Sequence, residues 1–358
     1  MSKKIKLFLG AYVDFLNAQN INCQALSKYL DKSKFEIITM LHPKGNDGNF
    51  RKEPGVRYIR QFRSMRKLGW LAFMWGIARA DVAYLPKWEH DDFCRSWARL
   101  CGTKVFTTLE GILDDILLGK MTPERRRAYV EHFRLYEPWL YPITKYLKSH
   151  PGDNISYNFA PEVLYLGVES SHFKPGDRVR TSLQNIVFIG NDIVRKNIDD
   201  FFGAAKIHPD IEFHIVGGNK LATCTLQEYL QQHPMSNVTY HGRLNHAQLQ
   251  ELLLQMDLMY FPSHSEGFPK VHLETACAGV PTLCYADYGA DEWITTGKNG
   301  YVVRTRNEAY AVIEHLKEHP EELQSLSCHA VELGRSFDWS ILVKTWEDVI
   351  MRIYNSHK

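Results

Sequence analysis

The amino-acid sequence predicts an α/β protein made of two doubly wound domains. At 358 residues the chain is longer than one ordinary hydrophobic core requires, so two domains are expected. Short apolar runs alternate with helix-like segments along the chain, which is typical of parallel sheets covered by helices. The segment Gly167–Leu183 contains a Pro-Gly pair, has the composition of a linker and lies near the middle. We therefore expect domains at residues 1–167 and 168–338 and a final amphipathic helix within 339–358.

Eight apolar runs are predicted to be strands. Each is bounded by Gly, Pro or charged residues, as buried strands of parallel sheets usually are. The runs are Ile5–Leu9, Phe35–Met40, Asp81–Leu85, Lys104–Leu109, Asn185–Ile189, Glu212–Val216, Val238–His241 and Met256–Phe261. Doubly wound sheets bind ligands beyond the carboxyl ends of their strands. The loops after the last four runs are therefore expected to share one rim and to carry the chemistry.

The composition argues against several classes of protein. Apolar residues make up 44% and charged residues 23% of the chain, as in soluble globular proteins. The seven cysteines are odd in number and include no CxxC pair, which argues against a disulfide framework or a zinc site. The N-terminus lacks the apolar core of a signal peptide, and the most apolar segment, Leu68–Ala78, is shorter than the ~20 residues that span a bilayer. A cytoplasmic location is expected.

The net charge of +2 conceals an asymmetry between the two halves of the chain. Residues 1–170 hold 26 Lys and Arg against 18 Asp and Glu, whereas residues 171–358 hold 17 against 23. Most of the basic excess lies in Arg51–Lys67, where seven basic residues face the single acid Glu53, just before the apolar and aromatic segment Leu68–Ala78. Docking of this region on an anionic membrane surface is one interpretation. A core helix with a solvated basic lead-in is the other.

Two carboxylates, Glu266 and Glu274, lie eight positions apart, the first beside a glycine and the second in a helix-like run. If the helix begins near Pro269, its free backbone N–H groups and positive dipole end form a site for phosphate oxygens. Glu266 then precedes the helix and Glu274 lies just over one turn inside it, so both can face one ligand. The alternative is an acidic residue at a helix start followed by a solvated helical glutamate.

The surrounding segment PSHSEGFPKVHLETACAGVPTL resembles the EX7E signature of the GT4 family of retaining glycosyltransferases. The matching positions are Pro262, Ser263, Glu266, Gly267, Phe268, Leu273, Glu274, Ala276, Gly279 and Pro281. The stretch IGNDIVRKN is similar to the family's GR-x-x-x-x-KG pattern, and FHIVGGN, NVTYHGRL and LGVESSHFKP are similar to further family segments. The resemblance implies the GT-B fold, in which two Rossmann-like domains face each other across a cleft. The first domain would bind the acceptor, the second the nucleotide sugar, and the last helix would pack back on the first domain.

The resemblance also implies residue roles. Lys196 would contact the donor diphosphate, Glu266 the hydroxyls of the transferred sugar, and Glu274 the hydroxyl pair of the ribose. The remaining donor-binding positions, which would shape the phosphate loop or border the base, are Asn191, Arg195, Gly242, Arg243, Leu244, Gly267, Phe268, Pro269 and Lys270. A lysine can neutralise charge on a departing phosphate, and a carboxylate can accept two hydrogen bonds from a diol. Glu266 and Lys196 are therefore the expected catalytic residues.

The chain departs from the family pattern at two places. The family usually has an arginine where this sequence has Asn191, and we expect either that Arg195 supplies the missing cation or that it is a solvated residue at a helix start. Many family members also place a histidine after a strand of the first domain, where this chain has Glu110. On the acceptor side the candidates are Gly10, Tyr12 and Glu110.

No metal site is expected from the sequence. It contains no Asp-x-Asp triplet, and none of its sixteen histidines pairs as HxH or HExxH. The reaction is therefore expected to need no metal and no other cofactor. His42, His90, His132 and His172 are expected to be ordinary surface or loop residues. His264 and His272, which flank the signature, are expected to have structural roles.

The function implied by the resemblance is transfer of a sugar from a UDP- or GDP-linked donor to a glycan or lipid-linked acceptor, in cell-surface polysaccharide or glycolipid synthesis. Two other classes remain: a nucleotide-sugar epimerase of similar fold, and an inactive protein that only binds sugar nucleotides. We find no acid and base set for the former, and the intact Glu266, Lys196 and Glu274 argue against the latter. No nucleic-acid partner is expected. A peripheral position on the inner face of a membrane follows only if the basic segment docks.

Overall fold

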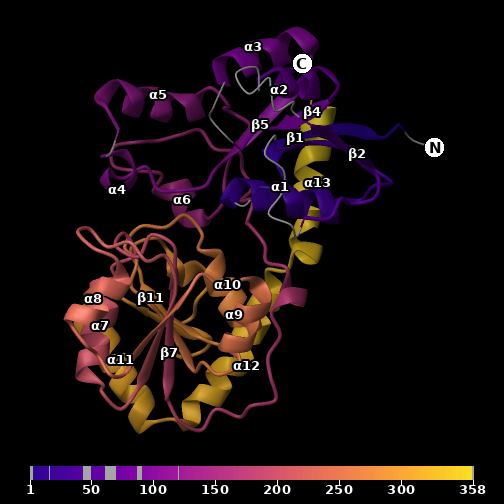
Figure 1. The fold of residues 1–358 in the computed structure, drawn as a ribbon. Coiled ribbons are helices and arrows are strands. Elements are labelled where there is room, and N and C mark those ends of the chain that lie inside the picture. The colour runs from indigo at the N-terminus through magenta and orange to yellow at the C-terminus, as the bar shows by residue number, and fades with distance from the viewer. Residues whose placement is uncertain are drawn as a thin grey trace. The chain divides into compact units, whose positions relative to one another are not determined.

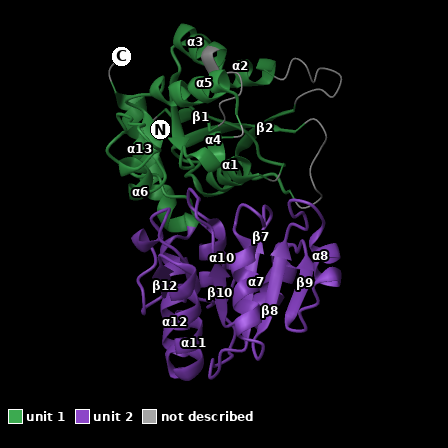
Figure 2. Ribbon diagram, turned by 90° about the vertical axis from the view of Figure 1, so that its left-hand side faces the viewer, with its two compact units in different colours: residues 1–167, 339–358 green, residues 168–338 purple. Residues whose placement is uncertain are grey.

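The chain divides into two compact units. Unit 1 comprises residues 1–167 and 339–358, and unit 2 comprises residues 168–338 (Figure 2). The computed structural model describes residues 3–15, 17–42, 50–60, 70–86, 91–119 and 121–356. Each unit has a six-stranded sheet of its own, so each is described by itself.

Unit 1 contains a parallel sheet in the order β3-β2-β1-β4-β5-β6. This is the strand order of the Rossmann fold. The strands are β1 (Ile5–Tyr12), β2 (Phe35–Leu41), β3 (Val56–Arg60), β4 (Val82–Tyr84), β5 (Lys104–Leu109) and β6 (Leu140–Pro142). The helices are α1 (Ala18–Tyr29), α2 (Trp70–Ala78), α3 (Asp91–Cys101), α4 (Asp115–Leu118), α5 (Pro123–Arg134), α6 (Lys145–Ser149) and α13 (Trp339–Asn355).

Unit 2 repeats this architecture with the order β12-β11-β10-β7-β8-β9, and every neighbouring pair is again parallel. The strands are β7 (Asn185–Gly190), β8 (Glu212–Gly217), β9 (Val238–Gly242), β10 (Leu258–Phe261), β11 (Thr282–Tyr285) and β12 (Gly300–Val303). The helices are α7 (Ile198–Ile207), α8 (Leu226–Gln232), α9 (His246–Leu253), α10 (Lys270–Cys277), α11 (Arg306–Glu318) and α12 (Glu321–Ser336), with short 3-10 turns η2 (Ser170–His172) and η3 (Ala290–Glu292).

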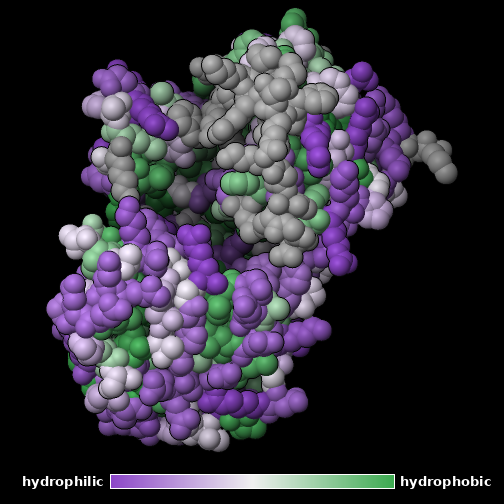
Figure 3. All heavy atoms as spheres, viewed as in Figure 1, coloured by the Kyte–Doolittle hydropathy of each residue, from purple (hydrophilic) through white to green (hydrophobic). Residues whose placement is uncertain are grey.

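Helices cover both faces of the unit 2 sheet. Figure 1 shows α7, α8 and α11 on one side of the strands and α9 and α10 on the other. Phe201 of α7 packs against Phe188, Phe213 and Tyr260 of three neighbouring strands, and all four side chains are fully buried. Covering both faces explains why these strands are almost continuously apolar. On the face of the molecule in Figure 3, hydrophilic residues predominate on the outer surface of unit 2.

The final helix α13 belongs to unit 1. Its Trp346 is 1% exposed, and the indole N–H donates to the carbonyl oxygen of Tyr165 at 3.1 Å. Glu347 is also buried, where it accepts hydrogen bonds from the backbone N–H of Asp31 and from Lys34 Nζ, at 2.8 and 2.7 Å. Burial of one helix face against the sheet and α1 gives this C-terminal segment its place in the first unit.

Gly10 lies inside β1, and not after its end as the sequence suggested. A Cβ atom at Gly10 would lie 2.8 Å from Leu85 Cδ2 and 3.3 Å from Phe73 Cε1. Glycine is therefore required there by close packing in the core of unit 1. The strand continues past Gly10 to Tyr12, and the role of Gly10 on the acceptor side stays a prediction.

The prediction of an α/β protein with two doubly wound domains is confirmed, and all eight predicted runs contain a strand. Four further strands were missed: β3, β6, β11 and β12. Strand β3 lies within the predicted basic segment at the edge of the sheet, and its residues are half-buried except for the exposed Arg57 and Arg60. The helix α2 buries Phe73, Gly76 and Ile77 in the core of unit 1.

The prediction that His132 is a surface or loop residue is wrong, because it lies on α5 and is 5% exposed. Its ring contacts Phe133 and Tyr136. His172 is exposed and His42 is half-buried, whereas His90 lies outside the described residues. Burial lowers the pKa of His132 from 6.5 to about 4, since the charged imidazolium cannot be hydrated there.

Acidification is therefore expected to destabilise unit 1 through His132. Below pH 6.5 the unfolded chain binds a proton at this side chain, and the folded chain does so only near pH 4. Between pH 7 and pH 5 the free energy of unfolding should fall by about 2 kcal/mol. We expect His132→Gln, which cannot titrate, to show a correspondingly smaller pH dependence of unfolding. Equal pH dependence of the free energy of unfolding in the two proteins would contradict this assignment.

Candidate functional site

Two loops far apart in the sequence meet at the carboxyl edge of the unit 2 sheet. One follows β7 and carries Lys196, and the other follows β10 and carries Glu266. Strands β7 and β10 are neighbours at the point where the strand order reverses. Doubly wound sheets bind ligands at this switch point. Lys196 Nζ donates to Glu266 Oε1 at 2.5 Å, so the structure brings the two predicted catalytic residues together.

Lys196 is held by packing as well as by charge. Its side chain is 12% exposed, and Nζ lies 4.3 Å from the ring centroid of Phe261. Gly190 makes room for the lysine, because a Cβ atom there would lie 2.4 Å from Lys196 Cδ. Burial lowers the pKa of the Lys196 ammonium, while the charge of Glu266 opposes this shift. A residue larger than glycine at position 190 would thus collide with the side chain of Lys196.

Glu266 accepts three hydrogen bonds at one carboxylate oxygen. Besides Lys196, Ser263 Oγ donates to Oε1 at 2.8 Å and Arg195 Nη2 donates at 3.2 Å. Arg195 Nη1 also donates to the carbonyl oxygen of Ser265, which ties the two loops together. Ser263 was matched in the signature but given no role, and its spacing of three residues from Glu266 was the available signal.

Arg195 therefore lies in the site and is not a solvated residue at a helix start. Its side chain is 27% exposed and contacts Glu266. Asn191, by contrast, is exposed. Of the two alternatives drawn from the sequence, the geometry favours the one in which Arg195 provides a second cation beside Lys196.

The helix α10 begins at Lys270, with Pro269 at its N-cap position. Pro269 makes no side-chain capping hydrogen bond, and the backbone N–H of His272 donates to the carbonyl oxygen of Pro269 at 3.0 Å. The preceding Phe268 is 7% exposed and packs against Trp293 and Phe337, with ring centroids 4.8 and 5.5 Å away. The buried ring of Phe268 thus anchors the loop that precedes α10. Gly267 and Lys270, on either side of it, are half-buried.

Glu274 is half-buried on α10. Burial raises the pKa of its carboxyl group, and the charges of His246 and Lys270 oppose this shift. His246 is the first residue of α9, directly after the loop that ends β9. Glu274 is therefore electrostatically linked to the element that follows the predicted base-binding loop.

That loop consists of Gly242, Arg243 and Leu244. Gly242 has a φ of +71°, which favours glycine, and no heavy atom lies within 4 Å of where its Cβ would be. Arg243 is exposed and Leu244 is half-buried. At the end of the neighbouring strand, a Cβ at Gly217 would lie 2.1 Å from the carbonyl oxygen of Gly190. The strand ends at this edge are thus packed backbone to backbone.

The two histidines beside the signature have partners within unit 2. His264 Nδ1 lies 2.8 Å from Asp287 Oδ2, and its ring stacks on that of Tyr285 at 4.6 Å. His272 is fully buried, and its Nδ1 accepts a hydrogen bond from Trp293 Nε1 at 3.2 Å. Burial lowers the pKa of His272 well below its ordinary value, so the ring is neutral.

The acceptor-side candidates lie in unit 1. Glu110 directly follows β5, and its Oε1 accepts hydrogen bonds from Thr108 Oγ1 and Tyr84 OH at 3.0 and 3.2 Å. Tyr12 is the last residue of β1, and its backbone N–H donates to Asn20 Oδ1 at 3.1 Å. Both residues thus lie at the carboxyl edge of the unit 1 sheet.

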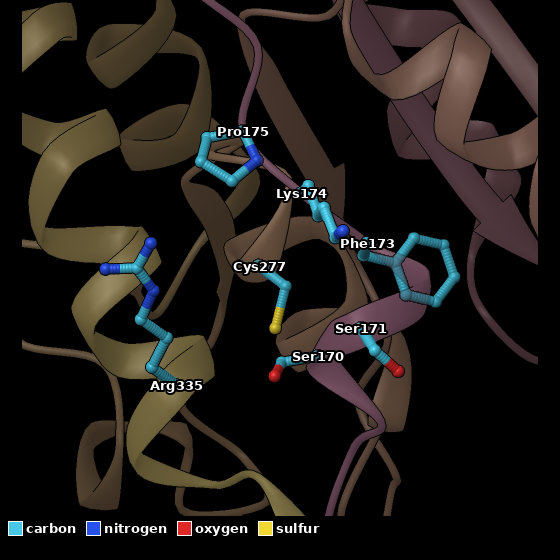
Figure 4. A pocket seen from close by; sticks show the side chains of 7 residues that line it. All are labelled: Ser170, Ser171, Phe173, Lys174, Pro175, Cys277 and Arg335. Carbon is cyan, nitrogen blue, oxygen red and sulfur yellow. The ribbon is translucent and has the colours of Figure 1, made fainter.

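A cavity of about 440 Å³ lies beside the far end of α10 (Figure 4). Its lining residues are Ser170, Ser171, Phe173, Lys174, Pro175, Cys277 and Arg335. In Figure 4 the Cys277 thiol points toward Ser170. None of the expected donor-binding residues lines this cavity, so it is separate from the site around Lys196.

Two features are absent from the part of the chain that the structure describes. No group of three or more His, Cys, Asp or Glu side chains is placed to hold a metal ion. None of the described helices has the length and apolar character needed to span a membrane.

The family match with known proteins lies within unit 2. Residues 174–330 match the family described as Glycosyl transferases group 1. Over 212 residues the chain is 24% identical to glycogen synthase of Mycobacterium tuberculosis, covering 56% of this chain and 51% of that protein. Over 181 residues it is 28% identical to alpha-galactosylglucosyldiacylglycerol synthase of Streptococcus pneumoniae, covering 48% of each. The chain thus spans about half the length of the curated relatives it matches.

Solved structures match along almost the whole chain. Sucrose-phosphate synthase from Thermosynechococcus elongatus superimposes with a TM-score of 0.77 at 14% identity, covering 98% of this chain and 99% of that one. HepE from Anabaena, solved in complex with UDP and glucose, gives a TM-score of 0.71 at 14% identity, with 97% and 99% coverage. At this identity the likeness concerns the fold alone. The chain therefore has the GT-B fold, and its second unit matches the glycosyl transferases group 1 family.

Proposed function

We propose that this protein is a retaining glycosyltransferase of the GT4 type, which moves a sugar from a nucleotide diphosphate to a glycan or lipid-linked acceptor. The observation that carries the proposal is the meeting of Lys196 and Glu266 at the switch point of unit 2. The family match over residues 174–330 supports it independently. HepE, which shares the fold, is solved with UDP and glucose, and this favours a UDP-linked donor as the first to be tested.

In the proposed reaction the residues of unit 2 bind and orient the donor. Lys196, Arg195 and the first turn of α10 stabilise the diphosphate as the bond to the sugar breaks. Glu266 accepts hydrogen bonds from sugar hydroxyls, and Glu274 accepts two from the ribose diol. The acceptor hydroxyl attacks the same face of the sugar that the phosphate leaves, and its proton passes to that phosphate. The configuration at the anomeric carbon is thereby retained.

The acceptor class rests on two relatives. One is named for glycogen and the other for a glycolipid, so their names point to a glycan and a lipid-linked acceptor respectively. Cell-surface polysaccharide or glycolipid synthesis is the process we propose. The acceptor would bind at unit 1, beside Tyr12 and Glu110.

Radiolabelled UDP- and GDP-sugars, each incubated with glycan and lipid acceptors, would test the proposal. A transferase gives a labelled product linked to the acceptor, and an epimerase gives a changed sugar still on its nucleotide. Binding of the donor without any product would indicate an inactive binding protein. The configuration of the labelled linkage, determined by NMR, would establish retention or inversion.

Turnover is expected to be unchanged by EDTA. Lys196 and Arg195 are two cations already placed beside the proposed diphosphate position, which reduces the need for a divalent ion. The measurement is the rate of product formation in excess EDTA, compared with the rate in added Mg²⁺ or Mn²⁺. A loss of activity in EDTA that either ion restores would contradict this prediction.

Docking of unit 1 on an anionic membrane is proposed from the basic segment Arg51–Lys67. Within the described part of this segment, Arg60 is exposed, whereas the guanidinium of Arg57 lies 4.7 Å from the ring centroid of Trp75 on α2. On the same helix Leu71 is 41% exposed. The residues Arg63, Arg66, Lys67 and Leu68 lie outside the described residues. Each basic side chain near such a surface contributes about 1 kcal/mol, which salt weakens.

The protein is accordingly expected to co-sediment with anionic but not with neutral vesicles at low salt. A variant with Arg51, Lys52 and Arg60 changed to glutamine should bind more weakly, while Arg125→Gln, on the exposed start of α5, serves as the control. If the unchanged protein stays in the supernatant with anionic vesicles at low salt, the docking proposal is wrong and a water-soluble acceptor should be sought.

A further inference from the structure

The carboxylate of Glu266 is already paired with Lys196 and Arg195, the two cations that a diphosphate would need. Its Oε1 accepts from Lys196 Nζ at 2.5 Å and from Arg195 Nη2 at 3.2 Å. Ser263 Oγ donates to the same atom at 2.8 Å and is fully buried. The side chains of Glu266 and Lys196 are only 11% and 12% exposed, so water screens their attraction weakly. In this state one carboxylate neutralises part of the charge of two cations, and the cluster keeps a net charge of +1.

A diphosphate can enter this cluster in two ways, and each has a cost. Either Lys196 and Arg195 leave Glu266, or they bind both groups and hold a carboxylate close to the phosphate oxygens. The first way leaves a half-buried carboxylate without its charge partners, and the second places like charges together. Both weaken binding of a free diphosphate.

A diphosphate that carries a sugar would offset this cost. The sugar hydroxyls, which donate hydrogen bonds, would replace the lost partners of Glu266. The free diphosphate left after transfer has no such hydroxyls at this position. The same carboxylate would therefore favour the sugar-bearing donor over the product that shares its nucleotide.

We propose that Glu266 is a specificity-determining residue that makes the site prefer the nucleotide sugar to the free nucleoside diphosphate, and so promotes release of the product. This inference rests on the proposed function, because it assumes that Lys196 and Arg195 bind the diphosphate. It gives Glu266 a role in addition to orienting the sugar. Ser263 is a positioning residue in this arrangement, because it holds Oε1 between the two cations.

The variant Glu266→Gln tests the proposal, because it keeps a hydrogen-bond acceptor and removes the charge. Affinities for free UDP, free GDP and the matching nucleotide sugars should be measured by calorimetry for the unchanged protein and the variant. We expect about tenfold tighter binding of the free diphosphate, on the scale of 1.4 kcal/mol per factor of ten, and no tighter binding of the nucleotide sugar. Glu251→Gln, an exposed position on α9, is the matched control and should change neither affinity.

Two outcomes would overturn the inference: free diphosphate bound no more tightly by Glu266→Gln than by the unchanged protein, or both ligands tightened equally. Inorganic pyrophosphate separates this failure from failure of the proposed function. If neither nucleotide binds the unchanged protein, the proposed donor is wrong. Pyrophosphate then still tests whether Glu266 competes with a diphosphate for Lys196 and Arg195. If it does, Glu266→Gln should bind pyrophosphate more tightly than the unchanged protein. Equal affinities of the two proteins for pyrophosphate would refute this competition. Melting temperatures of all variants establish that they are folded.

Discussion

Replacement of Lys196 by glutamine is expected to lower kcat by about 10²- to 10³-fold, the largest effect we expect from a single substitution. Lys196 is the most buried cation of the site. It contacts Glu266 and Phe261 and packs closely against Gly190. A fixed charge in a site that excludes water stabilises a departing phosphate without reorganisation, and loss of one such group commonly has this magnitude.

The matched control is Lys206→Gln on the exposed side of α7, which should leave kcat unchanged. Initial rates at saturating donor, together with the affinity for the donor, separate an effect on turnover from an effect on binding. A fall in kcat of less than tenfold in the folded Lys196→Gln protein would remove Lys196 from the catalytic role.

The strands that could be predicted are those whose apolar runs stand out from their surroundings. The missed strands are short, with three to five residues. Strand β3 consists of VRYIR in a basic segment and has no run of apolar residues. Strand β6 is buried but has only three residues, LYP, and ends in a proline, so it does not stand out in the sequence. Strand β11 begins with the last two residues of the signature, Thr282 and Leu283. Tertiary pairing, and not local propensity, places these residues in the sheets.

The sequence indicates which loops carry the chemistry, but it does not indicate which of these loops lie next to each other. The contact of Lys196 with Glu266 depends on β10 returning to pair with β7, and strand order is not contained in local patterns. For the same reason the sequence left two alternatives for Arg195 and gave Ser263 no role. The domain limits expected near residues 167 and 338 coincide with those of the compact units, whereas the roles assigned to the two domains stay predictions.

The burial of Glu274 favours a role in ligand binding over a role in stabilising the fold. Burial raises the pKa of its carboxyl group, which means that the folded state disfavours its charge. The substitution Glu274→Ala should therefore cost little stability. A carboxylate held in a half-buried position can, on the other hand, form strong hydrogen bonds with a diol that enters the site.

We expect Glu274→Ala to weaken binding of the nucleoside diphosphate by about 1.5–3 kcal/mol, which corresponds to roughly 10- to 150-fold in affinity. The ribose hydroxyls would lose both of their proposed acceptor bonds. Calorimetry with the ribo- and 2′-deoxyribonucleoside diphosphates gives the sharpest test. The unchanged protein should bind the ribonucleotide more tightly, and Glu274→Ala should no longer distinguish the two, while Glu251→Ala on α9 should behave like the unchanged protein. Equal affinity of the unchanged protein and Glu274→Ala for the free ribonucleoside diphosphate would show that this carboxylate does not hold the ribose.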